Sequence, residues 1–249
     1  MPQEKILSEI TQPADAVRSC FESGACFAAG TLVHTKEGLK PIEQIQVGDW
    51  VLSKPENGGE QACKRVVKTF AHPPERVVEV QYVLPNQDIN SSQGFRVGRL
   101  VATPSHPFWT KEEGWTAPIN MQGYGMTHFH FEDKDGADLD YCTIKNIYIS
   151  DQPNVGWTPA RNTVRTDDLG HLRDYFHKKW LALEVSAIDA VVDIDYADDR
   201  DALYFKMPVY SLDVEDFHTY YVGEHGIWVR NRNCGGLEIW DSQRKVGVG

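Results

Sequence analysis

The sequence predicts an all-β domain, and three observations support that prediction. Short runs of β-branched and aromatic residues recur at intervals of roughly 8–12 residues, as strands do. Turns rich in glycine and proline separate them, with 20 Gly and 13 Pro in 249 residues. Residues 209–231 alternate apolar and polar side chains and then double back around the polar run 223–226, which is typical of a β-hairpin. A hydrophobic content of 41% is enough for a buried core.

The strands expected in the first half follow one another after Cys26. Residues 36–38 and 47–49 supply turns, and residues 55–59 a loop. Pro73 and Pro74 are expected to separate two strands, because proline cannot donate to a strand ladder. The strands predicted in this half cover residues 31–35, 39–45, 50–53, 65–70, 76–83 and 99–103.

Residues 123–184 break this rhythm and predict a small insertion of mixed structure. The run from Asp167 to Trp180 predicts a helix, because an aspartate stands at its start and lysines stand near its end. Strands are expected to resume at Val185 and to continue through residues 190–194 and 203–205.

Charge and composition exclude several classes of protein. A net charge of −11 disfavours a nucleic-acid-binding surface, which needs basic residues against phosphate. No apolar run is long enough to cross a bilayer, and residues 1–12 lack the apolar segment of a signal peptide. Five cysteines form an odd and sparse set that does not predict a disulfide framework. We therefore expect no nucleic-acid and no membrane partner.

Two groups of residues could carry chemistry in the first half. Cys26 follows the small residues Gly24 and Ala25, which leave its own upstream carbonyl accessible to a thiolate. The alternative is a buried structural cysteine, which is the commoner fate of a free thiol. Thr103 and His106 flank a proline turn, and they offer a hydroxyl and an imidazole to a reacting peptide. Their alternative is an ordinary junction between a strand and a turn.

The second half offers Asn231 and His218, at the end of the expected hairpin and on its first strand. An asparagine side chain can attack its own backbone carbonyl, and an imidazole can assist. A metal site from His128, His130 and Cys142 is a further alternative, but no second cysteine pair at zinc spacing accompanies it. We therefore expect no metal and no cofactor.

Taken in order, these segments resemble the Hint (hedgehog–intein) superfamily, with a closer likeness to bacterial intein-like domains inside large polymorphic toxins. The resemblance implies a horseshoe-shaped all-β domain with two pseudo-twofold halves and with both chain ends in one cleft. It also implies residues 1–25 as an N-terminal leader, 26–231 as the domain and 232–249 as a C-terminal tail. The matching motifs lie at residues 26–31, 47–49, 100–108, 209–212, 218–223 and 226–231.

The resemblance implies a single-turnover, self-cleaving domain with a cysteine nucleophile. Cys26 would attack the carbonyl of Ala25 and convert the amide into a thioester. His106 would protonate the leaving nitrogen while Thr103 holds the junction. Asn231 would cyclise and break its bond to Arg232 with help from His218, so that the flanking toxin segments are released. The substrate is then the chain's own flanking polypeptide, and we expect a monomer.

Three positions depart from the family pattern. Arg230 stands where proficient members have a histidine, and arginine exchanges no proton near neutral pH. Arg232 replaces the nucleophile that splicing needs, so joining of the flanks has no acceptor. Ser211 replaces a frequent aspartate. The pair Asn233–Cys234 is a second-ranked junction.

Other functions remain open at this point. Thioester formation and hydrolysis at Cys26 could be the only reaction that survives. A function of a different class is structural: an inactive Hint fold that serves as a spacer in a larger secreted toxin. The sequence does not define the compartment of such a parent protein.

Overall fold

The structure is a computed structural model, and it describes residues 24–84, 96–121, 129–140, 143–160, 168–190 and 200–231. Within those ranges the chain is almost entirely β-strand, with one short α-helix, α2 (Pro118–Met121). The all-β prediction is confirmed. No helix of the described ranges is long and apolar enough to span a membrane.

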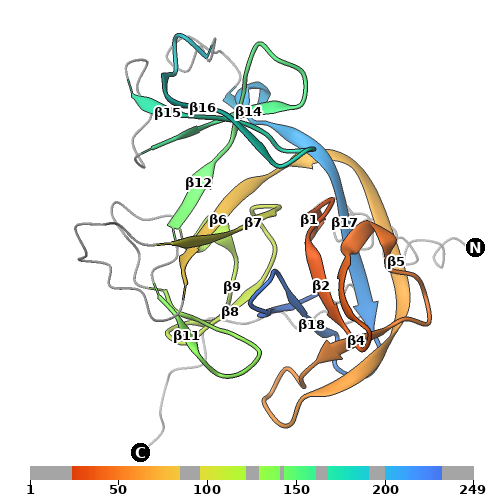
Figure 1. Ribbon diagram of the computed structural model, residues 1–249. Helices are drawn as coiled ribbons and strands as arrows, with labels where there is room; N and C mark the ends of the chain where they lie inside the picture. Colours follow the sequence, from red (N-terminus) through yellow and green to blue (C-terminus); the bar gives the residue numbers. More distant parts are fainter. Residues whose placement is uncertain are drawn as a thin grey trace, which may run out of the picture.

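Thirteen strands join into one strongly curved sheet that forms the main body (Figure 1). The two 3₁₀ turns η1 (Ile42–Gln44) and η2 (Arg200–Leu203) lie in connections. The hydrogen-bonded order is β12 (Thr143–Asn146), β6 (Val78–Val83), β7 (Val97–Ala102), β1 (Phe27–Ala28), β17 (Lys206–Val214), β5 (Ala62–Arg76), β4 (Trp50–Ser53), β2 (Leu32–Thr35), β18 (Thr219–Val222), β19 (Ile227–Arg230), β8 (Phe108–Thr110) and β9 (Gly114–Thr116), with β3 (Gly38–Pro41) beside β2.

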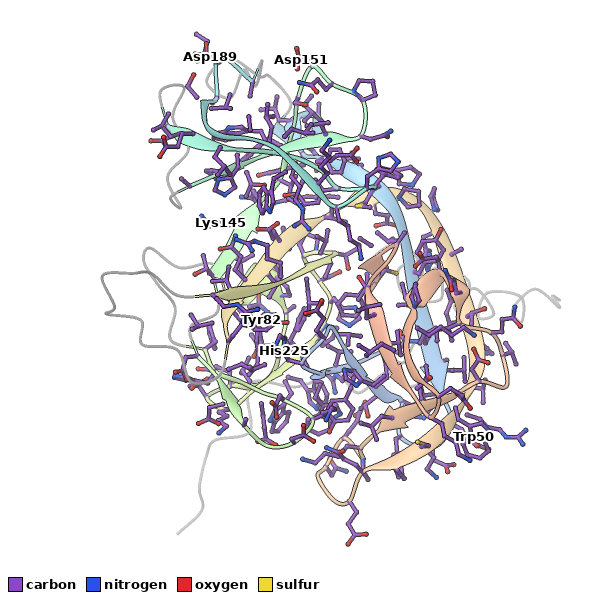
Figure 2. All side chains as sticks on the ribbon, in the orientation of Figure 1. Trp50, Tyr82, Lys145, Asp151, Asp189 and His225 are labelled. Carbon is purple, nitrogen blue, oxygen red and sulfur yellow. The ribbon has the colours of Figure 1, made fainter. Side chains whose placement is uncertain are left out.

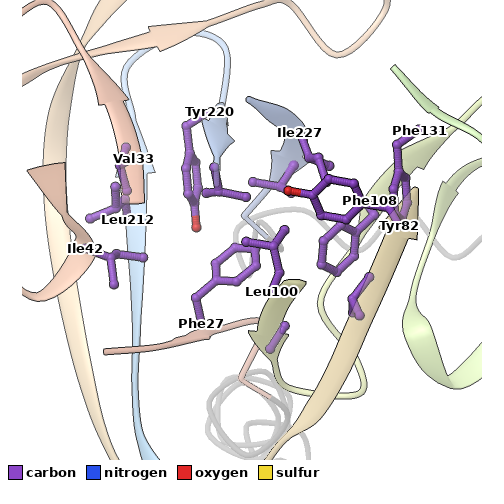
Figure 3. Close-up of a cluster of buried hydrophobic side chains, with 14 of the residues drawn as sticks. Phe27, Val33, Ile42, Tyr82, Leu100, Phe108, Phe131, Leu212, Tyr220 and Ile227 are labelled. Carbon is purple, nitrogen blue, oxygen red and sulfur yellow. The ribbon is translucent and has the colours of Figure 1, made fainter. Parts of the chain in front are cut away.

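The long strand β17 is buried on both faces. Leu212 faces the main hydrophobic core (Figure 3). Val214 belongs to the same core, and Tyr210 packs against it. Met207 and Val209 face a second buried cluster that contains Cys26. The burial is two-sided because a hydrophobic cluster covers each face of β17.

Strand β5 runs through Pro73 and Pro74 without a break, so the expected separation at these prolines is wrong. The register between β5 and β17 shifts there, because Met207 pairs with Glu75 while Val209 pairs with His72. Between these pairs one residue of β17, Pro208, therefore lies opposite two of β5, Pro73 and Pro74. The prolines occupy this irregularity, where a missing N–H costs little.

A separate four-stranded sheet consists of β13 (Tyr148–Ile149), β14 (Val155–Pro159), β15 (Leu169–Asp174) and β16 (Lys179–Ser186). It lies above the main body in Figure 1. A small hairpin, β10 (Phe131–Glu132) with β11 (Asp138–Leu139), packs instead on the main core.

The helix expected over residues 167–180 is wrong, because β15 and β16 form a hairpin there. The Asp174 carboxylate accepts the backbone N–H groups of Phe176 and His177 at 3.0 Å each, which fixes the turn. Gly170 packs so closely that an added Cβ would lie 2.4 Å from the Thr158 carbonyl oxygen. The charge pattern that suits a helix thus also suits a hairpin with an aspartate at its turn. Residues 203–205 likewise form the end of η2 and a short link rather than a strand.

A buried ionic cluster joins the two sheets. The Glu79 carboxylate has no exposed surface and contacts Arg173 Nη1 at 3.2 Å, Arg99 Nε at 3.4 Å and the Tyr175 hydroxyl at 3.3 Å. Lys145, at the same junction in Figure 2, donates to two backbone carbonyls at the end of β14 at 2.8 and 2.6 Å.

The expected C-terminal hairpin is confirmed, since β18 pairs with β19 from Thr219 and Arg230 to Val222 and Ile227. Gly223 and Gly226 both take a positive φ, of 76° and 73°, which a residue with a Cβ adopts reluctantly. The turn is fixed by His225, whose Nδ1 lies 3.3 Å from the Tyr82 hydroxyl (Figure 2).

Candidate active site

Cys26 immediately precedes β1, and its side chain has no exposed surface. Strand β1 lies between β17 and β7, with Phe27 opposite both Tyr210 and Ala102. Burial raises the pKa of the Cys26 thiol to about 12; a hydrogen bond with Ser211 lowers it and the charge of Glu75 raises it further. The sulfur is therefore a thiol at neutral pH, and it needs a proton acceptor before it can act as a nucleophile.

Thr103 hydrogen-bonds to the backbone on both sides of the peptide bond between Ala25 and Cys26. Its Oγ1 accepts the backbone N–H of Cys26 at 3.0 Å and donates to the Gly24 carbonyl at 2.7 Å. The backbone N–H of Thr103 also donates to the Cys26 carbonyl at 2.9 Å. The Ser105 hydroxyl lies 3.4 Å from the same Gly24 oxygen. The nitrogen that would leave in an acyl shift thus donates its N–H to the Thr103 oxygen, while the hydroxyl proton is directed at the Gly24 carbonyl.

His106 is fully buried beside this peptide, with its ring centroid 4.0 Å from that of Phe27. Burial lowers the pKa of the imidazole to about 3, and the nearby Ala25 carbonyl partly opposes that shift. Neither ring nitrogen meets hydrogen-bond geometry with a described residue, although the carbonyl is near enough to act on the pKa. A neutral, unpaired imidazole beside a carbonyl can donate to a developing oxyanion or accept a proton.

The β18–β19 hairpin contacts the segment that follows Thr103 and His106. The backbone N–H of Arg230 donates to the Pro107 carbonyl at 3.4 Å, and Val229 pairs with Phe108. The segment between Thr103 and Phe108 therefore contacts the N-terminal junction at one end and strand β19 at the other. Asn231 follows β19 directly, and its N–H donates to the His218 carbonyl at 3.0 Å.

The His218 imidazole does not bond to Asn231 among the described contacts. His218 stands just before β18 rather than on it, with a positive φ of 53°. Its Nδ1 lies 3.1 Å from the Asp213 carboxylate. The backbone of His218, and not its side chain, is therefore what holds Asn231 in this structure.

Arg230 is engaged on the outer side of the hairpin. Its Nη1 lies 3.4 Å from the Glu56 carboxylate, and its guanidinium sits 5.1 Å from the centre of the Trp115 ring. Both contacts attract the guanidinium, the aromatic face through cation–π interaction and the carboxylate through its charge. Arg230 thus supplies a fixed positive charge next to Asn231.

Several residues named from the sequence lie outside the described ranges. They are His128, Cys142, Arg232, Asn233 and Cys234. The metal site involving His128 and Cys142 stays untested, and His130 contacts the Glu112 carboxylate. Among the described residues no cluster of His, Cys, Asp or Glu is arranged to hold a metal.

Two side chains near the thiol had no signal in the sequence. Glu75 stands behind the paired prolines, and Tyr220 reads as an ordinary apolar position of a strand. Both act electrostatically together with Cys26. Finding them needs the register between β5, β17 and β1, which sequence spacing does not supply.

Comparison with known proteins adds a family match. Residues 32–158, just over half of the chain, match the family model described as the pretoxin HINT domain. No curated protein matches the chain.

Solved structures of similar shape include two from bacteria. A bacterial intein-like domain from Clostridium thermocellum is 21% identical, with 83% of this chain and 98% of that chain covered and a TM-score of 0.46. A DnaB intein from Synechocystis is 12% identical, with 83% and 98% covered and a TM-score of 0.45. These values are too low to transfer chemistry, so the family rests on the match over residues 32–158.

Proposed function

Because this chain belongs to the pretoxin HINT domain family, we propose that it is a self-processing module that cuts its own polypeptide once, at the bond between Ala25 and Cys26. One observation carries the proposal. Thr103 Oγ1 contacts both the Cys26 nitrogen, at 3.0 Å, and the Gly24 oxygen, at 2.7 Å, while an unpaired and buried His106 lies beside the Ala25 carbonyl.

The reaction is an acyl shift from nitrogen to sulfur. The Cys26 sulfur attacks the Ala25 carbonyl carbon, and the carbonyl oxygen takes up negative charge that the His106 N–H can stabilise. The carbon–nitrogen bond then breaks, and the Cys26 nitrogen receives a proton through the Thr103 hydroxyl. Water or an added thiol cleaves the resulting thioester and releases the residues upstream of Cys26.

The neutral state of His106 favours a different role from the one the resemblance implies. A group whose pKa is about 3 holds no extra proton at neutral pH, so it does not arrive as a ready acid. Its neutral N–H can still donate to the Ala25 oxygen. We therefore assign proton delivery to Thr103 and oxyanion stabilisation to His106.

Cleavage at the downstream end is proposed to be slow. Asn231 would attack its own carbonyl and release Arg232, but this step needs a proton for the leaving nitrogen. The neighbouring Arg230 has none to give at neutral pH, and the His218 imidazole is directed to Asp213 at 3.1 Å. The module then releases its upstream flank more readily than its downstream one.

The proposed organisation follows from these junctions. Residues 1–25 form the upstream flank, 26–231 the processing domain and 232–249 the downstream flank. The sheet over Tyr148–Ser186 is an elaboration of that domain. The substrate is intramolecular, so no separate partner is needed.

Treatment with dithiothreitol tests the proposal. Wild-type protein incubated with the thiol should lose residues 1–25 in a time course on a gel, because the thiol intercepts a thioester. The Cys26→Ala variant should stay intact under the same conditions. Equal loss from both proteins would mean that cleavage does not pass through the Cys26 sulfur.

A second candidate is an inert Hint domain that separates two parts of a toxin. The observation in its favour is the thiol itself, which burial keeps protonated with a pKa of about 12. An inert domain stays intact with dithiothreitol at every pH at which it remains folded, so the same experiment decides between the two.

A further inference from the structure

We propose that the Cys26 thiol transfers its proton to the Glu75 carboxylate, and that the Tyr220 hydroxyl then stabilises the thiolate. This inference rests on the self-processing function proposed above. It names groups around the sulfur that the family resemblance does not supply, because Ser211 replaces the aspartate frequent in that pattern.

Strand pairing places Glu75 on the side of the sheet that faces the thiol. Glu75 lies opposite Met207 in the β5–β17 pair, and cross-strand partners share one face of a sheet. Met207 belongs to the buried cluster that contains Cys26. Glu75 therefore lies on the face of the sheet that holds Cys26, next to the irregularity at the two prolines.

Distances at Gly24 place both groups beside the same backbone. A Cβ built on Gly24 would lie 3.1 Å from the Cys26 sulfur and 3.9 Å from Glu75 Oε1. The thiol and the carboxylate thus flank one residue of the scissile segment. Gly24 has no side chain to separate them.

Tyr220 is a fully buried phenol in the core. Its ring has no exposed surface and packs 6.4 Å from Phe27, and Figure 3 shows its hydroxyl on the Phe27 side. The hydroxyl meets hydrogen-bond geometry with no described residue. Besides burial, charge on Cys26 raises the pKa of this hydroxyl, and the nearby Leu212 backbone lowers it by hydrogen bonding. Because charge on Cys26 acts on this hydroxyl, the hydroxyl lies within electrostatic reach of a thiolate formed there.

Ser211 completes the surroundings of the sulfur. Extending the pairing of Phe27 with Tyr210 by one residue puts Ser211 opposite Cys26, and its hydroxyl hydrogen-bonds to the thiol. Two neutral hydroxyls can donate to a thiolate but cannot keep its proton. The carboxylate of Glu75 is the one anionic group, among the causes that act on the thiol, that can.

The step balances without any external reactant. The S–H bond breaks as its proton moves to the Glu75 carboxylate, and the electron pair of sulfur forms the bond to the Ala25 carbonyl carbon. The carbon–nitrogen bond breaks next. The proton held by Glu75 returns to the Cys26 nitrogen by way of the Thr103 hydroxyl, so the amide N–H becomes an amine and no net proton is gained or lost.

The charge of Glu75 lets one variant distinguish repulsion of the thiolate from acceptance of the thiol proton. Because that charge raises the pKa of the thiol, Glu75→Gln should make the thiol easier to ionise. If repulsion were its only effect, the variant would react faster than wild type. A proton acceptor predicts the reverse, a loss of roughly 10²-fold in the rate of thioester formation.

The experiment measures the first-order rate of cleavage by dithiothreitol. Glu75→Gln should be slowed about 100-fold, and the exposed control Glu60→Gln should match wild type. Tyr220→Phe keeps the ring and should be slowed about tenfold. Its control is Tyr221→Phe, which removes the neighbouring hydroxyl that Gln61 contacts at 3.1 Å on the other face. A wild-type or faster rate in Glu75→Gln would overturn the assignment of Glu75 as the proton acceptor. Equal rates in the two tyrosine variants would overturn the assignment of Tyr220 as the group that stabilises the thiolate.

A second readout does not require cleavage. The infrared S–H stretching band of Cys26, identified by its loss in Cys26→Ala, reports the acceptor of the thiol proton. Glu75→Gln should shift the band to higher frequency, since the variant removes the negative charge that acts on the thiol and a neutral amide oxygen attracts its proton less. An unchanged band would reject Glu75 even if wild type proves inert. A shifted band in an inert protein would instead retain the effect of Glu75 on the thiol and reject the self-processing function.

Discussion

At the scale of single residues, the account depends on three buried polar groups around one peptide bond. Thr103, His106 and Cys26 have little or no exposed surface, and each would normally be satisfied or replaced in a core. Their types and order could be predicted from the sequence. Their charge states could not, because the neutral thiol and the neutral imidazole result from burial by strands far apart in the chain.

The Thr103 hydroxyl is expected to set the rate at the upstream junction. Thr103→Val removes the oxygen that contacts the Cys26 nitrogen at 3.0 Å while keeping the shape of the side chain. The rate of dithiothreitol cleavage should fall by about 10²-fold. Thr103→Ser restores the hydroxyl and should recover most of the rate. If valine and serine variants react alike, the hydroxyl has no role in proton delivery.

His106 should make the fold sensitive to acid. Its pKa is about 3 in the folded chain against an ordinary value of 6.5. Between these values the unfolded chain binds a proton that the native state does not, so stability is lost as pH falls from about 6.5 to about 3. The loss from this group amounts to a few kcal/mol, at roughly 1.4 kcal/mol per pH unit.

Urea unfolding at a series of pH values checks this sensitivity. His106→Gln should be less stable than wild type at pH 7, and the difference should shrink steadily toward pH 4. A constant difference between His106→Gln and wild type across the range would show that His106 does not titrate with a depressed pKa.

At the scale of elements, the sequence predicts strands well where turn chemistry is local. The β4 bounds and the C-terminal hairpin match the expectation because glycine and polar turns frame them. The helix over 167–180 failed because the decisive contact is tertiary, the close packing of Gly170 on β14. The break expected at Pro73 and Pro74 failed for a similar reason, because a register shift between β5 and β17 accommodates the two prolines within one strand.

Arg230, at the end of the β18–β19 hairpin, should limit the rate of cleavage after Asn231. Arg230→His places an exchangeable proton beside Asn231, and cleavage after Asn231 should speed up by about tenfold or more. The time course of the downstream peptide, followed by mass spectrometry, measures this. Adding Asn231→Ala to that variant should stop the reaction. If Arg230→His cleaves no faster while folded, the limit lies elsewhere, with Ser211 and the Asp213-bound His218 as the next positions to change.

At the scale of the whole molecule, the small sheet contacts the surroundings of Cys26. Tyr175, in the turn that follows β15, shares a buried cluster with Cys26, and its hydroxyl lies 3.3 Å from Glu79. The Lys178 ammonium donates to the Gly30 carbonyl at 2.5 Å, just after β1. The sequence marked this region as an insertion, but its contact with the thiol cluster needed the three-dimensional pairing of distant strands.

Removing the central charge of that junction should weaken the whole fold. Glu79→Gln leaves Arg99 and Arg173 without their buried carboxylate, and breaking such a group costs about 3–5 kcal/mol. The control Glu132→Gln removes a partly exposed pair with Lys54 at 3.9 Å, which is worth less than about 1 kcal/mol. Urea unfolding at pH 7 compares the two. Equal losses would mean that the ionic cluster does not hold the sheets together.

The most direct test of the central claim is the mass of the product released by hydroxylamine. Hydroxylamine attacks a thioester at its carbonyl carbon, so wild-type protein should yield residues 1–25 with a hydroxamate on Ala25, together with a chain that begins at Cys26. The Cys26→Ala variant should yield neither. Intact wild-type protein after long incubation in its folded state, or cleavage at a different bond, would contradict the assignment of Cys26 as the nucleophile.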